Sequence, residues 1–459
     1  MKIQSKLSSD LKISRIITGL WQMADIEREE DIDPKAYAEK IIPYVEAGLT
    51  TFDMADHYGS SELIVGEYNI NNSTSDVQLL TKWVPKPGKV DKQSVSDAVQ
   101  LALDRMKQTS IDLMQYHAWY YPDPSWLDAL FYLTELKQEG LIKNIGVTNF
   151  DAAHLRVACA SGIPIVSNQI SHSLIDQRAN SSKIIDVCNE YGIKLLAYGV
   201  VMGGFLTNKW LNKNEPKPEN LKTWSEMKYK RFIDESGGWD AYQNLLNVVN
   251  QIAQNNDVSI ANICSRYILE NPLIAGIIIG ARLGENNHIK DNLNILKTKI
   301  SKEEINLIRD AQKELNPIPG DCGDEYRKPP YLTASGDLSH HFQEIPKIYD
   351  SNILVEGREH VSSNTKWEEL ASYSRAVKYK DRIVVSGTTA TYGDLTIGGD
   401  DASAQTYFII DKIEAAINSL GGSLKDVIRT RIFIKNLSDW ELVAKAHGER
   451  FKDIMPANT

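Results

Sequence analysis

The stretch TFDMADHYGSSE (residues 51–62) places an acid and a phenol directly after a short apolar run. Asp53 ends the run, and Tyr58 follows five positions later with Gly59 beside it. Taken alone, this pattern is typical of a strand that ends in polar caps, with Tyr58 as a surface aromatic. The alternative is a strand that delivers two reactive side chains to one site. Only the rest of the chain distinguishes the two interpretations.

Apolar runs rich in β-branched residues recur along the chain and predict strands. The eight runs are SRIITGLW (14–21), TTFDMAD (50–56), VQLLTKWV (77–84), IDLMQYH (111–117), IKNIGVTN (142–149), IVSNQIS (165–171), KLLAYGV (194–200) and AGIIIGA (275–281). Most segments between them predict half-buried helices, because apolar residues recur at i, i+3 and i+4. Alternating strands and helices indicate parallel βα units, and eight of them in under 320 residues favour a closed (β/α)8 TIM barrel over an open sheet.

The pattern changes after about residue 316. Residues 316–346 are rich in proline, glycine and polar residues and show no periodicity, which predicts an irregular connection. We therefore expect a barrel over residues 1–317, a linker over residues 318–350 and a second domain over residues 351–459.

The composition excludes several classes of function. The formal net charge is −10, whereas a protein that binds the phosphate backbone normally has a basic excess, so no nucleic-acid partner is expected. No apolar run reaches the roughly 18 residues of a transmembrane helix, and the polar N-terminus lacks a secretory signal, so no membrane partner is expected either. The four cysteines are scattered without C-x-x-C spacing, which argues against disulfides or a metal site and favours a cytoplasmic location.

In a (β/α)8 barrel the reactive groups lie at the carboxyl ends of the strands. Besides Asp53 and Tyr58, Lys82 lies near the end of the third predicted strand and His117 closes the fourth. A tyrosine hydroxyl can give a proton to a developing alkoxide, and a buried lysine beside it favours the phenolate. An aspartate compensates the lysine charge, and a neutral histidine can orient a carbonyl oxygen. None of these groups supplies a hydride, so a cofactor has to supply it.

Seven short motifs stand in order along the predicted barrel. They are FDMADHYG (52–59), TK (81–82), the histidine at 117, GVTNF (146–150), NQ (168–169), AYGVVMGGFLT (197–207) and IIGAR (278–282) followed by DNL (291–293). With these motifs, residues 1–315 resemble the aldo-keto reductase family. The resemblance implies hydride transfer from NADPH, with NADH as the alternative, to a small-molecule aldehyde or ketone. It also implies a catalytic tetrad of Asp53, Tyr58, Lys82 and His117, with Tyr58 as the general acid.

The resemblance further implies a set of residues that bind the cofactor. Asn149 and Gln169 are implied to hold the nicotinamide amide, and Tyr198 to stack on the nicotinamide ring. The adenosine and its 2′-phosphate are implied to lie against Gly280, Ala281, Arg282 and Asn292.

Two positions depart from the family pattern near this set. Gly199 stands where a serine usually follows the stacking tyrosine, which removes one hydroxyl that could bind phosphate. Ile279 stands where a proline usually precedes Gly280. No second arginine is evident near Arg282, so the choice between NADP and NAD stays open at this point.

The loop HAWYYPDPSW (117–126) is rich in aromatic residues. Either it only packs on the barrel, or its Trp119 forms an apolar wall of the substrate pocket together with Trp21 and Trp83. The sequence favours neither interpretation over the other.

After the connection, strand-like stretches (374–390 and 427–437) alternate with helical ones (403–422 and 438–454), which is typical of a small α+β domain. The pieces YSRAVKYKDRIVVSGTTA (373–390) and HGERFKDIMPANT (447–459), with the stretch between them, resemble the Rid family of reactive-intermediate deaminases.

The Rid-like stretch departs from its family at the C-terminal end. Where active members carry an arginine that binds the substrate carboxylate, this chain has Asn458, and an amide cannot form the bidentate charge-assisted pair. The family pattern also continues for about two more strands, so the domain is expected to be incomplete. We expect no ordinary imine hydrolysis, and the resemblance implies an oligomerising or ligand-binding role, with a homo-oligomer formed through this domain.

Two functions from different classes remain at this level. The first is an NADPH-dependent carbonyl reductase with an appended Rid-like domain. The second is a non-catalytic nicotinamide-binding sensor whose reductase fold regulates the second domain or a partner. The presence of all four tetrad residues favours the first.

Overall fold

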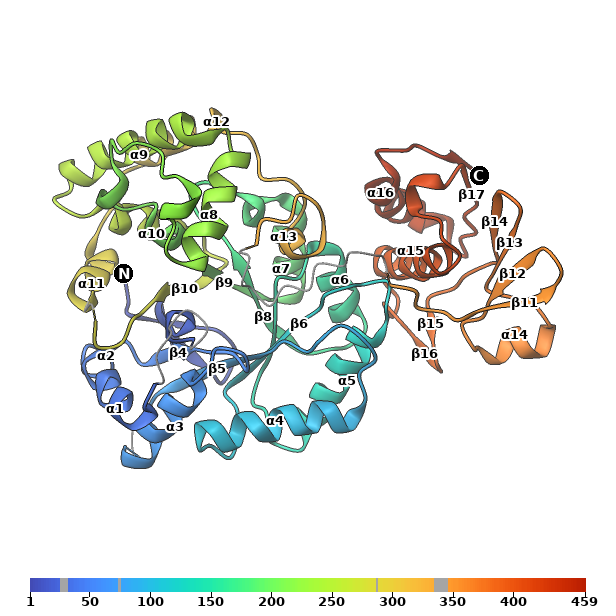
Figure 1. The fold of residues 1–459 in the computed structure, drawn as a ribbon, viewed down its shortest axis with the longest axis horizontal. Coiled ribbons are helices and arrows are strands. Elements are labelled where there is room, and N and C mark those ends of the chain that lie inside the picture. Colours follow the sequence, from blue (N-terminus) through green and yellow to red (C-terminus); the bar gives the residue numbers. More distant parts are fainter. Residues whose placement is uncertain (25–31, 73–75, 286–287, 334–345) are drawn as a thin grey trace.

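The computed structural model describes residues 1–24, 32–72, 76–285, 288–333 and 346–459. Within them, eight parallel strands close into a barrel in the order β10-β3-β4-β5-β6-β7-β8-β9 (Figure 1). Their bounds are β3 Ile16–Gly19, β4 Thr51–Asp53, β5 Gln78–Trp83, β6 Leu113–His117, β7 Ile145–Thr148, β8 Ile165–Ser171, β9 Lys194–Tyr198 and β10 Ile274–Gly280. Each of the eight predicted runs overlaps one of these strands, so the predicted (β/α)8 barrel is confirmed.

Helices cover the outside of the barrel (Figure 1). They are α1 Pro34–Ala38, α2 Ile42–Glu46, α3 Ser61–Asn71, α4 Lys92–Met106, α5 Ser125–Gln138, α6 Ala152–Ala160, α7 Ser182–Tyr191, α8 Trp224–Glu235, α9 Gly238–Asn255, α10 Ile260–Ile268, α11 Ile289–Lys297 and α12 Lys302–Lys313. Their ends follow local chemistry: Asp91 and Ser94 form a capping box at the start of α4, and Gly192 ends α7 with a φ of 71°. In the described part of the chain, no helix combines the length and apolar character needed to cross a membrane.

A hairpin of β1 (Gln4–Lys6) and β2 (Lys12–Ser14) closes one end of the barrel. The Ser5 hydroxyl donates to the carbonyl oxygen of Ala275, near the start of β10, so the hairpin lies at the amino ends of the strands. Its Leu7 and Leu11 belong to the same buried cluster as inward-facing strand residues such as Leu80. The amino end is therefore filled with apolar side chains, and the carboxyl ends remain available for a site.

The first half of the predicted linker is docked on the barrel. Residues 318–333 include the short helix α13 (Asp324–Arg327), and Leu332 is buried against the barrel helices. The guanidinium of Arg178 donates to the carbonyl oxygen of Asp321 (2.9 Å) and to Glu325 (2.7 Å). Ion pairs and backbone bonds hold this segment, which explains why hydrophobic periodicity does not reveal it. Residues 334–345 of the predicted linker lie outside the described residues.

The second domain has a sheet in the antiparallel order β11-β12-β13-β14 with helices beside it. Its elements are β11 Ser351–Val355, β12 Arg358–Val361, α14 Lys366–Ala371, β13 Ala376–Tyr379, β14 Arg382–Val385, β15 Thr391–Tyr392, β16 Leu395–Thr396, α15 Ala402–Ser419, β17 Arg429–Thr430, α16 Trp440–Phe451 and β18 Ala457–Asn458. Ala416 and Leu420, in and just after α15, pack against Val361 and Ala376 of the sheet, so the predicted small α+β domain is confirmed.

The predicted strand over residues 427–437 is wrong in its extent. In the described residues only β17 forms there, paired in parallel with β18. Ile428 is 85% exposed and Phe433 is 91% exposed, so no second layer of the described residues covers these two apolar side chains. A strand needs a neighbouring strand for its hydrogen bonds, and β18 supplies one for two residues only.

Candidate functional site

The four tetrad candidates line one cavity of about 800 Å³ at the carboxyl ends of the strands. Asp53 ends β4, Lys82 lies in β5, His117 ends β6, and Tyr58 lies in the loop before α3. In parallel strands of a barrel, residues at equivalent ends meet around the same rim. Topology therefore explains why residues distant in sequence share this cavity.

Lys82 lies between the acid and the phenol. Its ammonium donates to Asp53 (2.6 Å) and to the carbonyl oxygen of Met54 (2.8 Å), and it lies 4.8 Å from the centre of the Tyr58 ring. Burial lowers the pKa of Lys82, and the negative charge of Asp53 opposes this shift. The ion pair is buried on both sides, so the aspartate compensates a cation that faces the phenol.

His117 presents one ring nitrogen that has no hydrogen-bond partner among the described residues. Its Nδ1 lies 3.3 Å from the carbonyl oxygen of Thr148, and its buried Nε2 is the nitrogen without a partner. Burial, and then the positive charge of Arg327, hold the pKa of His117 well below its ordinary value, so the ring is neutral near pH 7. A neutral ring carries one proton, so it donates either to Thr148 or from Nε2 to a bound molecule.

The residues implied for the nicotinamide amide and ring also line the cavity. The Tyr198 hydroxyl donates to the side-chain oxygen of Asn149 (2.7 Å) and lies 3.2 Å from a carboxylate oxygen of Glu325. Gln169 donates to Asp53 (2.8 Å), which links it to the tetrad candidates. Asn149 has a φ of 59°, a backbone conformation that non-glycine residues rarely adopt. Asn149 and Tyr198 are thus held as one bonded pair, whereas Gln169 joins the Asp53–Lys82 pair.

At the end of β10 the cavity is lined by Gly280, Arg282 and Asn292. Ala281 does not line it and is buried in the hydrophobic core instead. The Arg282 guanidinium donates to the side-chain oxygen of Gln22 (3.2 Å), and the carboxylate of Glu285 lies 3.8 Å from it. Arg282 is the arginine at this end of the cavity, and Glu285 partly compensates its charge.

Gly199 lines the cavity at a position where a side chain would be strained and would crowd a neighbouring tyrosine. Its φ is 73°, and a Cβ atom there would lie 2.3 Å from the hydroxyl oxygen of Tyr229, on α8. The hydroxyl that the family's serine would carry is absent, but a tyrosine hydroxyl from another element occupies the neighbouring space. Tyr229 itself lines the cavity.

Two of the three tryptophans considered for the pocket wall line the cavity, and the third does not. Trp21 and Trp119 line the cavity, and Trp21 packs edge-on against Tyr58 with 4.8 Å between ring centres. Trp83 does not line it: it is buried in the core and packs against Tyr116. Successive side chains of a strand point to opposite faces, so Lys82 faces the interior and Trp83 faces the helices. The expectation for Trp83 is corrected accordingly.

Residues 15–313 match the family model described as the Aldo/keto reductase family. The chain belongs to this family. Residues 364–459 match a second model, described as Endoribonuclease L-PSP, which agrees with the Rid-like domain. As an aldo/keto reductase, the chain is an oxidoreductase that uses a nicotinamide cofactor.

Two relatives of the aldo/keto reductase are matched over more than half of this chain. The chloroplastic pyridoxal reductase of Arabidopsis thaliana is 23% identical over 289 residues, 59% of this chain and 74% of that protein. The NADH-specific methylglyoxal reductase of Escherichia coli is 24% identical over 338 residues, 67% of this chain and 97% of that protein. The solved glycerol dehydrogenase of Gluconobacter oxydans superposes with a TM-score of 0.57 at 20% identity, covering 70% of this chain and 98% of that one, which shows the shared fold.

The aldo/keto reductase site includes residues that the sequence did not predict. Tyr326, on α13, and Lys228, on α8, line the cavity, and the lysine donates to the tyrosine hydroxyl (2.6 Å). The Tyr326 ring centre lies 5.5 Å from that of His117. Tyr326 belongs to the segment without periodicity, so no sequence signal pointed to it.

In the Rid-like domain of the reductase, Asn458 lies at the surface. Its amide donates to the Thr430 hydroxyl (2.9 Å), and the imidazole of His447 lies 3.5 Å away. The two side chains that Asn458 contacts are a hydroxyl and an imidazole, and the guanidinium of Arg429 donates to the hydroxyl of the next residue, Thr459 (3.1 Å).

Proposed function

We propose that the protein reduces an aldehyde or ketone with NADPH, and that Tyr58 is the general acid. The observation that carries this proposal is the convergence of Asp53, Tyr58, Lys82 and His117 on one cavity, with Lys82 between the acid and the phenol. Such a set has the composition needed to protonate an oxygen next to a hydride acceptor.

The residues of the cavity fit a nicotinamide cofactor. The buried Nε2 of His117 has no described partner, which is the mark of a polar atom that a bound molecule satisfies. The lining extends from this nitrogen to the basic end at Arg282. In the proposal Asn149 and Gln169 hold the nicotinamide amide, Tyr198 supports the ring, and Gly280, Arg282 and Asn292 hold the adenosine end. When bound, the cofactor supplies the hydride.

The chain's own residues handle the proton. The Tyr58 hydroxyl gives its proton to the substrate oxygen as negative charge develops there. The Lys82 ammonium stabilises the phenolate that remains, and Asp53 keeps this ammonium charged in its buried setting. The Nε2–H form of His117 donates a hydrogen bond to the same substrate oxygen and so orients it.

The cofactor preference that we propose is NADPH, with NADH as the alternative. Arg282 can pair with the 2′-phosphate, which supports NADPH. Glu285 lies 3.8 Å from this guanidinium and would repel the same phosphate, which supports NADH. A relative that is named as NADH-specific, the methylglyoxal reductase, keeps the alternative open.

An aldehyde is the substrate class that we favour. Trp21, Trp119 and Tyr326 form an aromatic wall beside Tyr58 and His117, which suits a small apolar or aromatic carbonyl compound. Two relatives are named for aldehyde substrates, pyridoxal and methylglyoxal.

The test is the loss of NADPH absorbance in the presence of a panel of aldehydes and ketones, with the wild type compared with Tyr58→Phe. We expect turnover of one or more aldehydes by the wild type and a large loss in the variant. A wild-type protein that binds NADPH yet reduces no compound of the panel would support the non-catalytic sensor instead.

For the Rid-like domain we propose a homo-oligomer or a ligand-binding role, in a cytoplasmic protein. Support comes from large apolar side chains that are mostly exposed on this domain, such as Leu354 (73%), Phe433 (91%) and Leu437 (79%). Sedimentation velocity of the full chain measures the oligomer directly, and a monomer at all concentrations would exclude it.

A further inference from the structure

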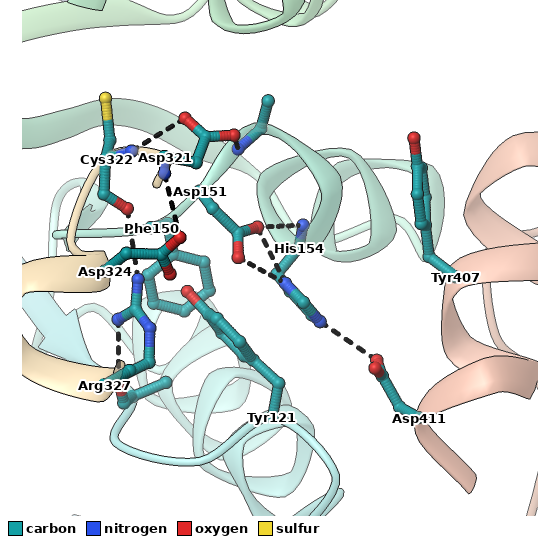
Figure 2. Close-up of polar contacts among 12 residues, drawn as sticks. Tyr121, Phe150, Asp151, His154, Asp321, Cys322, Asp324, Arg327, Tyr407 and Asp411 are labelled. Atoms are coloured by element: carbon teal, nitrogen blue, oxygen red, sulfur yellow. Dashed lines mark hydrogen bonds and ion pairs between the residues drawn. The ribbon is translucent and has the colours of Figure 1, made fainter. Parts of the chain in front are cut away.

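The second domain docks along α6, the helix that follows the turn carrying Asn149. Helix α15 of the second domain lies beside α6 (Figures 1 and 2). Near the start of α6, the Nε2 of His154 lies 3.0 Å from a carboxylate oxygen of Asp411 on α15. Near its middle, Arg156 pairs with Asp401, just before α15. Two charged contacts therefore join the barrel to the second domain on this one helix.

The far end of α6 is held as well. The backbone N–H of Gly398 donates to the hydroxyl of Ser161 (2.9 Å). A Cβ atom on Gly399, whose φ is 51°, would lie 2.8 Å from the carbonyl oxygen of Ala160. The backbone of Gly399 thus packs directly on the backbone of α6, and the second domain contacts this helix from near its start to its end.

The imidazole of His154 joins the docking contact to the cap of α6. Asp151 caps the helix by accepting from the backbone N–H of His154 (2.8 Å), and its two oxygens lie 2.7 and 2.8 Å from the Nδ1 of the same residue. The other nitrogen of the ring reaches Asp411, as Figure 2 shows. Asp151 is two residues after Asn149, so the cap forms part of the proposed nicotinamide-binding turn.

A second route leads from His154 to the same turn. The Tyr121 ring stacks on the imidazole, with 3.4 Å between centres and 4° between planes. The Arg327 guanidinium lies 4.6 Å from the Tyr121 ring centre and donates to the carbonyl oxygen of Asn149 (2.6 Å). Figure 2 shows this row of side chains between α15 and the barrel. Both routes start at the Asp411 contact and end at the Asn149–Asp151 turn.

Asp411 is fixed from its own side of the interface. Arg450 on α16 donates to Asp411 (2.5 Å) and to Glu414 (2.5 Å). Asp411, His154 and Asp151 are all buried, so few water molecules compete for their bonds. Burial alone lowers the pKa of His154, but Asp151 and Asp411 outweigh it and raise that pKa, which favours a ring that donates from both nitrogens.

We propose that His154 is a positioning residue through which the docked second domain holds the Asn149–Asp151 turn and so strengthens binding of the nicotinamide cofactor. The proposal rests on the proposed role of Asn149. A residue with a positive φ keeps that conformation only where its surroundings impose it, and the His154 contacts are part of these surroundings. The Rid-like domain then contributes to the reductase site without touching the cofactor.

The test uses Asp411→Ala in the full chain. This change leaves His154 paired with Asp151 and Arg450 paired with Glu414, so it removes mainly the His154–Asp411 contact among the links between the domains. We expect faster amide hydrogen exchange in residues 149–154 and an NADPH dissociation constant raised about threefold to tenfold, with kcat at saturating cofactor nearly unchanged. The matched control is Tyr392→Phe, which deletes another bond between the domains, to Asp128 on α5, away from the turn.

A double-mutant cycle separates positioning from general loosening. His154→Phe keeps the stack on Tyr121 but loses both nitrogen contacts, and the double variant with Asp411→Ala should bind NADPH no worse than His154→Phe alone. Wild-type exchange and affinity in a folded Asp411→Ala, or an equal effect of Tyr392→Phe, would overturn the proposal. Should the wild type bind no nicotinamide cofactor, the proposed function fails, and the exchange of residues 149–154 still decides whether His154 holds the turn.

Discussion

Gly323 rests directly on the backbone of Asn149: a Cβ atom at residue 323 would lie 1.9 Å from the Asn149 carbonyl oxygen. Gly323 has a φ of 79° and precedes α13. The segment that was predicted to be a linker thus packs directly against the proposed nicotinamide-binding turn.

Gly323→Ala is expected to weaken both the fold and the cofactor site. The left-handed conformation costs about 1–2 kcal/mol for alanine, and the clash with Asn149 adds about 1–3 kcal/mol to the loss of unfolding free energy. Chemical denaturation measures the first effect and NADPH titration the second. Gly140→Ala is the control, since Gly140 also has a positive φ (87°) but open space around its Cβ position, and equal losses in the two variants would contradict the close contact.

Tyr58→Phe is expected to lower kcat by about a hundredfold to ten-thousandfold, because the variant has no proton to give. The NADPH dissociation constant should change little, since the ring itself remains. Steady-state kinetics with a reactive aldehyde and a fluorescence titration of NADPH give the two values. Tyr132→Phe, on α5 and outside the cavity, should behave as the wild type. Retention of kcat in Tyr58→Phe would remove Tyr58 from the mechanism.

Arg282→Gln is expected to raise the NADPH dissociation constant about tenfold to a hundredfold and to leave that of NADH nearly unchanged, because a charge-assisted bond to the 2′-phosphate is lost. Glu285→Gln should shift the preference the other way, since it removes a negative charge 3.8 Å from the guanidinium. Parallel titrations with both cofactors measure the ratio. An unchanged ratio of the NADPH and NADH dissociation constants in Arg282→Gln would show that another group binds the 2′-phosphate.

Tyr229→Phe is expected to weaken cofactor binding a few-fold, about the value of one hydrogen bond. Its hydroxyl occupies the space next to Gly199, where the family's serine would stand. The same titration measures the effect, and kcat should be retained. Tighter binding in the variant would mean that the hydroxyl obstructs the cofactor.

The contribution of His154 to stability is expected to fall as the pH rises. Its folded-state pKa is raised above the unfolded value of about 6.5, so the contribution is fully present below about pH 6.5 and is lost as the pH passes through the raised value. Tyr121 stacks on the ring, Asp151 and Asp411 bond its nitrogens, and Arg450 and Arg327 face these partners. The melting-temperature difference between the wild type and His154→Phe, measured from about pH 6 to about pH 9, should shrink; a constant or growing difference would contradict the prediction.

Much of the barrel could be predicted because each strand and helix has a local sequence pattern, and this pattern repeats eight times. The tetrad could be placed because the topology of such a barrel brings the strand ends together. Asp53, Lys82 and His117 stand at equivalent ends of neighbouring strands, so their meeting follows from the fold class. The interpretation that placed Trp83 in the pocket wall is wrong because it ignored the alternation of the strand, which points Trp83 toward the helices. The prediction that Ala281 lines the cavity is wrong for a similar reason. Gly280 and Arg282 on either side of it line the cavity, whereas Ala281 packs in the core.

The remaining features depend on contacts between distant segments. Tyr326 reaches the cavity because ion pairs such as Arg178–Glu325 hold α13, and nothing in its local sequence signals this. The extent of β17 depends on how much of a partner strand lies beside it, which apolar alternation cannot reveal. The His154–Asp411 contact joins two domains that the sequence treats as separate modules.

The barrel is closed by the pairing of β3 with β10, in which Ile16 lies opposite Ile277. During synthesis, β3 leaves the ribosome long before its neighbour on that side has been translated. The nascent chain therefore carries an unpaired strand edge until translation is well past its midpoint. We expect production of this protein to depend on the supply of chaperones that shield such edges, more than its final stability alone would suggest.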